Sequence, residues 1–204
     1  TPPLLAISIH DFDVYEALVA SETDLQAKLS DGCNILHMAV EGGNLTICNI
    51  LIKTFIRKGV SLDSQNKDGT TALHLSAIHN QPDICKALLQ AGSDINVENH
   101  PQHTALFLSI YHQHHEVAAI LMAQEPTVNV VTSDNETPLF YAIKHGNIDE
   151  CKALIRLYTQ QNTGFNTQNS KGYTALHLAC ENGSMPICSM LIDAMVQNTA
   201  HLHI

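Results

Sequence analysis

A leucine-centred motif recurs six times along the 204-residue chain, and this recurrence constrains the fold more than any other feature. Residues 71–74 and 174–177 both read Thr-Ala-Leu-His, and residues 34–37 keep the leucine and the histidine. The motif leucines are spaced 32, 37, 33, 33 and 37 residues apart: Leu4, Leu36, Leu73, Leu106, Leu139 and Leu176. A period of this length predicts a stacked array of small structural units.

Each unit contains the pattern of two short helices. An apolar stretch follows the leucine, as in 72–79, and a polar or glycine-containing break follows that. The next stretch has apolar residues three to four positions apart, as at Ile84 and Leu88, which is helical spacing. Pro82 and Pro186 stand where this second helix is predicted to start, a position at which a missing N–H group is tolerated. A single helix pair is too small to bury its own apolar face, so the units must stack.

Two of the spacings are longer than the others, and both additions fall late in a unit. Residues 52–58 and 156–161 run on before the next glycine. Four extra residues form about one helical turn, and the added segments contain Phe55 and Tyr158, which can continue an apolar stripe. We therefore expect longer second helices in the second and fifth repeats; a longer loop at these two places is the alternative.

This pattern resembles the ankyrin repeat family, whose period is about 33 residues. The resemblance covers the chain end to end and implies an all-α solenoid of stacked helix-turn-helix units with short loop or hairpin tips. It implies one domain, 1–204, with approximate repeats 1–29, 30–65, 66–98, 99–131, 132–168 and 169–204. It also implies non-catalytic binding of a protein partner through the concave face.

Charge and motif content exclude several other classes. The formal net charge is −10 with histidine neutral, and protonating all 13 histidines would bring it to +3. An acidic chain lacks the basic footprint of a nucleic-acid binder, and no apolar run approaches the ~20 residues of a membrane helix. The phosphate-loop, nucleophile-elbow and zinc-protease motifs are missing. We expect no enzyme activity, cofactor or metal, no nucleic acid or membrane insertion, and a monomer.

The cysteines follow the repeat. Cys48, Cys85, Cys151 and Cys188 each stand twelve residues after a motif leucine. Equivalent positions in successive repeats advance along the array, whereas metal ligands must converge on one point. We predict that these four thiols form a column in the core. Cys180 is also predicted in the core, among small residues, and Cys33, in a predicted loop, is expected to be the one exposed thiol.

The histidines divide into two groups. In the ankyrin family the threonine and histidine of the Thr-x-Leu-His motif form hydrogen bonds within and between repeats, which implies a structural role for His37, His74 and His177. Phe107 and Phe140 replace this histidine in repeats four and five, and Leu5 replaces it in repeat one. The second group, His10, His79, His112 and His145, stands six residues after a motif leucine.

In this family the loop tips and the exposed ends of the first helices line the concave face. Transferred residue by residue, that arrangement predicts a partner-binding set: Ile78, His79, His100, His103, Tyr111, His112, Glu136, Lys144, His145, Lys171, Tyr173 and Glu181. The histidines and Tyr111 in the middle of this set would form a stripe. Imidazole titrates near neutral pH, so we expect partner affinity to change between about pH 7.5 and 5.5. Ordinary solvated histidines are the alternative.

A metal site at His112 and His115, which have helical spacing, is a weaker interpretation because no further ligands complete it.

A second interpretation concerns a longer parent protein. The first repeat begins at its helix, and the last residues, 201–204, do not form the polar cap that solenoid ends require. The chain would then be a targeting or substrate-recruitment segment of a larger enzyme or of a bacterial effector delivered to host cells. The expected location is the cytoplasm, or the host cytosol for an effector.

Overall fold

The computed structural model describes residues 25, 27–163 and 165–201, and within them it contains helices α3 to α12 and no strand. The fold is all-α, as predicted. The chain divides into two compact units, Thr1–His100 and Pro101–Ile204. The first-repeat positions Leu4, Leu5 and His10 lie outside the described residues.

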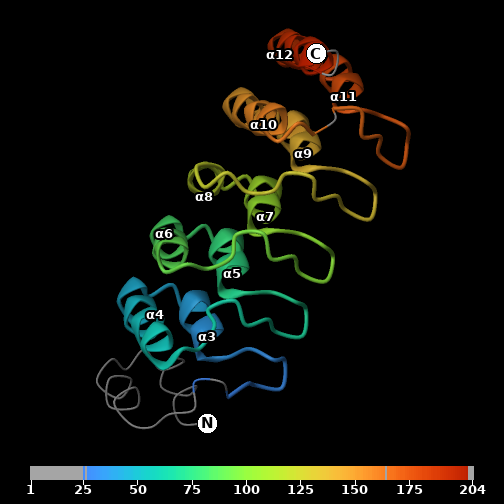
Figure 1. Ribbon diagram of the computed structural model, residues 1–204. Helices are drawn as coiled ribbons and strands as arrows, with labels where there is room; N and C mark the ends of the chain where they lie inside the picture. Colours follow the sequence, from blue (N-terminus) through green and yellow to red (C-terminus); the bar gives the residue numbers. More distant parts are fainter. Residues whose placement is uncertain (1–24, 26, 164, 202–204) are drawn as a thin grey trace. The chain divides into compact units, whose positions relative to one another are not determined.

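The described part of unit 1 contains two helix pairs, which are α3 (Ile35–Glu41) with α4 (Leu45–Lys58) and α5 (Ala72–Ile78) with α6 (Pro82–Gln90). The first helices α3 and α5 pack against each other, and so do the second helices α4 and α6. Loops that extend to one side lead into the first helices (Figure 1). This is the helix-turn-helix stacking that the repeat predicted.

Unit 2 contains three helix pairs: α7 (Ala105–Tyr111) with α8 (His115–Met122), α9 (Pro138–His145) with α10 (Ile148–Gln160), and α11 (Ala175–Glu181) with α12 (Met185–His201). Here α9 packs between α7 and α11, and α10 packs between α8 and α12. The first helices therefore form one layer of the unit and the second helices form the other.

Local sequence explains where the first helices begin. Thr71 caps α5 by accepting from the His74 N–H, and the His74 side chain accepts from the Thr71 N–H at 3.2 Å. This reciprocal capping satisfies donors that a helix start otherwise leaves unpaired. Asn34 and His37 form the same arrangement at α3. In unit 2, Pro138 supplies the first residue of α9, where no N–H is needed.

Glycine permits the loop tips of unit 1 to approach closely. Gly69 has φ of 72°, and a Cβ added there would lie 2.9 Å from the His100 backbone nitrogen. The His100 N–H donates to the Asp68 carbonyl at 2.9 Å, and the Lys67 N–H makes the equivalent bond to Asp31. A side chain at position 69 would push these tips apart.

The longer second helices are confirmed. Helix α4 has 14 residues and α10 has 13, compared with 9 in α6 and 8 in α8. Phe55 and Tyr158 from the added turns are buried, and the Tyr158 hydroxyl donates to the Val128 carbonyl at 2.9 Å. The extra turns therefore continue the apolar stripe.

The predicted core placement of four cysteines is confirmed, because Cys48 and Cys85 of unit 1 and Cys151 and Cys188 of unit 2 are all buried. The other two assignments were wrong. Cys33 is only 5% exposed, because its loop folds against the next tip and Asn66 Nδ2 lies 3.6 Å from its sulfur. Cys180 is exposed near the end of α11. No described helix combines the length and the apolar character needed to cross a membrane.

Candidate functional site

Five rings of unit 2 form a connected group, which we call the aromatic cluster: His103, Phe107, Tyr111, Tyr141 and His145. Phe107 and Tyr111 are four positions apart in α7, as Tyr141 and His145 are in α9, and this spacing places side chains on one face of a helix. His103 precedes the N-cap of α7 and stacks on Phe107. Packing of α7 against α9 brings the two rows together.

Tyr141 is the centre of the cluster. Its ring meets Phe107 edge-on with centroids 5.1 Å apart, and it lies 5.4 Å from Tyr111 and 6.4 Å from His145. The His103 and Phe107 rings stack at 4.2 Å. Edge-to-face and offset-stacked pairs are the favourable arrangements for aromatic rings, so the cluster is internally well packed.

The cluster has a buried base and an open edge. Phe107 is only 1% exposed, whereas Tyr111 is 49% exposed although its ring contacts three others. The buried Nδ1 atom of His145 has no hydrogen-bond partner among the described residues. A half-exposed tyrosine on a rigid aromatic base is suited to bind an apolar group with little loss of side-chain freedom.

An ion pair lies beside the rings. Lys144 Nζ is 2.7 Å and 2.6 Å from the two carboxylate oxygens of Glu136, and it also lies 4.7 Å from the centre of the Tyr141 ring. Asn169 Nδ2 donates to Glu136 Oε1 at 3.2 Å. These contacts join the loop before α9, α9 itself and the loop before α11.

Burial and hydrogen bonding together shift the pKa values of Glu136 and Tyr141. Burial opposes ionisation of Glu136, but hydrogen bonds from Lys144 and Asn169 outweigh it, and the pKa of this carboxyl is lowered. Burial, together with the Glu136 charge, raises the pKa of Tyr141 to about 12. Glu136 is therefore ionised and Tyr141 is neutral at neutral pH.

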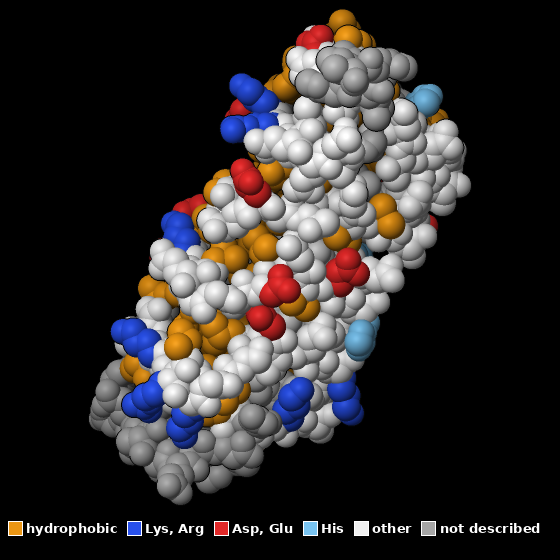
Figure 2. Space-filling view, viewed as in Figure 1, with side chains coloured by type: hydrophobic (Ala, Val, Ile, Leu, Met, Phe, Trp, Pro, Cys, Tyr) orange, Lys and Arg blue, Asp and Glu red, His pale blue; other side chains and the backbone are white. Residues whose placement is uncertain are grey.

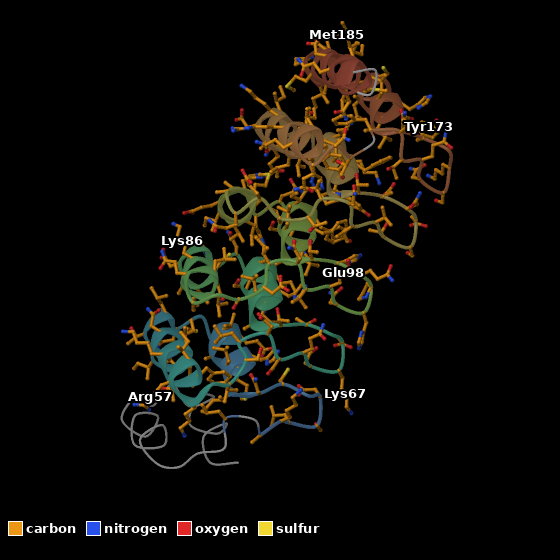
Figure 3. The ribbon with its side chains drawn as sticks, viewed as in Figure 1. Arg57, Lys67, Lys86, Glu98, Tyr173 and Met185 are labelled. Carbon is orange, nitrogen blue, oxygen red and sulfur yellow. The ribbon has the colours of Figure 1, made fainter. Side chains whose placement is uncertain are left out.

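The last loop tip carries two more predicted residues. Asn169 Oδ1 accepts from the backbone N–H groups of Lys171 and Tyr173, which shapes the tip. Tyr173 lies in the loop that leads into α11 (Figure 3), and its ring is 5.9 Å from that of His177. Glu181 is exposed at the last residue of α11.

Unit 1 contains the remaining predicted residues. Ile78 ends α5 half-buried, His79 is its exposed C-cap, and His100 is exposed in the loop that follows α6. Of the predicted stripe, the structure joins His103, Tyr111, His112 and His145 through ring contacts within unit 2. Within unit 2, His103, Tyr111 and His145 of the predicted stripe are thus members of the aromatic cluster, and His112 contacts it through Tyr111.

The motif histidines differ in burial. His37 and His74 are buried, and His37 Nε2 lies 2.9 Å from the Thr70 carbonyl of the next repeat. Burial lowers the pKa of His37. His177 keeps the cap contact with Thr174 at 2.8 Å but is exposed. The structural role that the resemblance implied is therefore found in unit 1, where His37 contacts its own repeat and the next one. At His177 the hydrogen bond with Thr174 is made within its own repeat.

Sequence reasoning missed Tyr141 and Asn169 and treated Phe107 only as a replacement for histidine. The signal at Tyr141 was present, because the equivalent positions two residues after the motif leucine are Met38, Leu75, Leu108 and Leu178. A tyrosine at a position that is otherwise aliphatic marks a local change of surface chemistry. Asn169 carried no such signal, since its importance comes from contacts with Glu136.

The predicted helical pair of His112 and His115 was wrong. His112 is the C-cap of α7, whereas His115 is the first residue of α8, so the two do not share a helix face. His112 stacks with His114 at 5.7 Å, and His115 is directed to Glu150. Among residues 25, 27–163 and 165–201, no group of three His, Cys, Asp or Glu side chains is placed to hold a metal ion.

Family comparisons match nearly the whole chain. The family described as "Ankyrin repeats (3 copies)" matches residues 4–99 and 93–163, and "Ankyrin repeats (many copies)" matches residues 139–192. Similar curated proteins include the putative ankyrin repeat protein FPV014 of fowlpox virus, which is 35% identical over 78 residues. The E3 ubiquitin-protein ligase XB3 of Oryza sativa subsp. japonica is 32% identical over 88 residues. These matches cover 38% and 42% of this chain, and 17% and 19% of those proteins.

Solved structures show the same fold. The ankyrin repeat domain of Bcl-3 superposes with a TM-score of 0.76 at 23% identity, covering 95% of this chain and 86% of that one. A chain from the complex of the Bd0816 predatory endopeptidase of Bdellovibrio bacteriovorus with immunity protein Bd3460 gives 0.69 at 24% identity, covering 95% and 97%. At these identities the likeness concerns the fold alone.

Proposed function

This chain belongs to the ankyrin repeat family, and from that premise we propose that it binds a protein partner through the face that carries the aromatic cluster. Ankyrin repeats are generally protein–protein interaction modules. The observation that carries the proposal is Tyr111, half exposed on a base of buried and packed rings. Tyrosines in such settings are typical binding hot spots.

The neighbouring groups suggest the chemistry of the partner. Lys144 and Glu136 neutralise each other, so the rings and imidazoles dominate this face. We infer that the partner presents an apolar side chain to the half-exposed ring of Tyr111. The proposed surface continues to the tip with Lys171 and Tyr173 in unit 2. Ile78, His79 and His100 belong to the proposed binding set of unit 1.

Binding by a preformed surface does not require catalysis, and we propose a non-catalytic role for this chain. The rings are held by mutual contacts and the loop tips by backbone hydrogen bonds, so little ordering is needed on binding. Burial lowers the pKa of His103 within the cluster. We propose that partner affinity changes between about pH 7.5 and 5.5, and that the part of the change caused by His103 falls toward the acidic end of this range.

A matched pair of variants tests the surface. The partner is first isolated from a lysate with the intact chain, and its dissociation constant is then measured by calorimetry for a Tyr111→Ala/His112→Ala variant. We expect the constant to rise at least about 30-fold, as for a hot spot of about 2 kcal/mol. Ile192→Ala is the control, because Ile192 on α12 is also 49% exposed and should change the constant less than about twofold. Equal effects of the two variants would place the interface elsewhere.

A second candidate function is suggested by the relatives, because they are much longer than this chain. The chain spans less than a fifth of the curated relatives it matches, and one of those is an E3 ubiquitin-protein ligase. We propose as the alternative that the repeats recruit a substrate for a catalytic domain of a longer protein. Sequencing of the complete transcript decides this alternative. A reading frame without a catalytic domain would eliminate it and leave the binding proposal intact.

A further inference from the structure

A pocket of about 660 Å³ lies between the second helices α8 and α10 of unit 2, away from the aromatic cluster. Its walls include the small or apolar side chains of Ala119, Met122, Ala153 and Leu157. Figure 2 shows hydrophobic, acidic and basic side chains close together over this pair of helices. The volume falls within the range of ligand-binding pockets, which is about 300–1,000 Å³.

A buried carboxyl group forms part of the lining. Glu150 is only 4% exposed, and its Oε1 atom lies 2.6 Å from His115 Nδ1. Its Oε2 atom is buried and has no hydrogen-bond partner among the described residues. An unpaired carboxylate oxygen in such a place is costly, and a donor that reaches it from the pocket would remove that cost.

His115 stands between Glu150 and solvent. Its side chain is 55% exposed, so the ring has room to rotate outward and admit a competing donor. Asn147 Oδ1 accepts the Glu150 backbone N–H at 3.1 Å, and Asn147 Nδ2 also lies 3.0 Å from His115 Nδ1, so the backbone bond holds the start of α10 when the ring contact is lost. The carboxyl group therefore keeps its position when His115 moves.

We propose that this pocket binds a lysine side chain of a protein partner. The aliphatic stem of lysine fits the apolar walls, and its ammonium group donates to Glu150. An ammonium group is a compact single charge, and it matches the one carboxylate oxygen, Oε2, that has no partner among the described residues. A second pocket of about 410 Å³ between α10 and α12 shares Arg156 and Gln160 with the first. A polypeptide lying across α10 would reach both, which favours lysine in a chain over a free amine.

The experiment uses n-butylamine, which is the lysine side chain alone, and N-acetyl-lysine methylamide. Both are titrated into the ¹⁵N-labelled chain at pH 7.5, and amide shifts of His115, Glu150 and Ala153 are followed. We expect saturable shifts, with the lysine derivative binding more tightly than butylamine and n-butanol binding at least about tenfold more weakly than butylamine. Tighter binding of butylamine than of the lysine derivative would overturn the assignment to a lysine side chain. Equal binding of butanol would overturn the role of the charge.

Two variants connect the binding to the pocket. Glu150→Gln keeps the shape and removes the charge, and it should raise the dissociation constant about tenfold or more. Asp83→Asn is the matched control, because Asp83 is an exposed acid in the first turn of α6 and changes the net charge equally. Ala119→Leu fills the pocket without touching Glu150 and should abolish the shifts even if Glu150→Gln fails to fold. Unchanged binding in a folded Glu150→Gln variant, or in Ala119→Leu, would overturn the proposal.

Discussion

Within each of the two units, the first helices of neighbouring repeats are joined, but the side chains that join them differ between the units. In unit 1 the buried His37 of one repeat contacts the Thr70 carbonyl of the next through its Nε2 atom. In unit 2 the equivalent motif position is Phe107, and its ring meets Tyr141 of the next repeat edge-on. Neighbouring repeats are thus joined by a directional polar contact in one unit and by ring packing in the other.

This difference has a functional side. A buried histidine uses both ring nitrogens internally, so it offers nothing to a partner. In the aromatic cluster, by contrast, Tyr111 is exposed and Tyr141 is half-buried, so both rings keep a part of their surface open to a partner. Replacing a polar junction with aromatic packing therefore creates binding surface as a by-product of holding the repeats together.

The largest expected effect comes from removing the base of the aromatic cluster. Phe107→Ala would lose contacts with His103, Tyr111 and Tyr141 and leave a cavity. We expect the free energy of unfolding to fall by about 3–5 kcal/mol, measured by urea denaturation followed by circular dichroism. Phe107→Leu, which keeps an apolar side chain, should cost less than half as much. Equal losses for the two variants would mean that ring packing does not join these repeats.

The polar junction of unit 1 should be weaker. His37→Ala removes two buried hydrogen bonds, one to the Thr70 carbonyl and one to Asn34 Oδ1. At about 0.5–1.5 kcal/mol for each bond, we expect the free energy of unfolding to fall by about 1–3 kcal/mol. The same measurement on His177→Ala should show a loss below about 1 kcal/mol, because His177 is exposed and contacts only its own repeat. A loss at His177 as large as that at His37 would contradict the role of the inter-repeat bond.

The polar junction should also respond to pH. Burial lowers the pKa of His37 from its ordinary value of 6.5, so the unfolded chain binds this proton more readily than the folded chain. Its contribution to stability is then complete above about pH 6.5 and is lost as the pH falls below that value, by at most about 1.4 kcal/mol per pH unit. Urea midpoints from pH 7.5 to 5.0 measure this. His37→Gln should flatten the curve, and an unchanged slope would show that other groups cause it.

The smallest effect concerns the thiols. Cys180 of unit 2 is exposed, whereas Cys33 of unit 1 is buried and burial raises its pKa. Iodoacetamide under native conditions should therefore modify Cys180 first and leave Cys33 unmodified, with stability changed by less than about 0.5 kcal/mol. Peptide mass spectrometry identifies the modified residue. Modification of Cys33 at a comparable rate would mean that its loop opens readily.

Much of the fold follows from periodic features of the sequence. The recurring leucine motif predicted the helix pairs and their stacking, and Phe55 and Tyr158 predicted the longer second helices α4 and α10. Apolar spacing carries this information because burial depends mainly on which helix face a residue occupies. The loop residue Cys33 escaped the same reasoning, since a loop has no repeating face and its burial depends on a neighbouring tip.

The sequence by itself determined the repeat architecture and the burial of the four cysteines that follow a motif leucine by twelve residues. The partner-binding residues that it suggested remain a prediction. Only the tertiary structure decided which of those residues meet, because contacts such as Tyr141 with Phe107 and Asn169 with Glu136 join residues about 33 positions apart. It also decided that Glu150, an ordinary acid in a helix start by its sequence, is buried with one oxygen unpaired beside a pocket. Periodicity fixes the face on which a side chain lies, but the adjacent repeat supplies its partners.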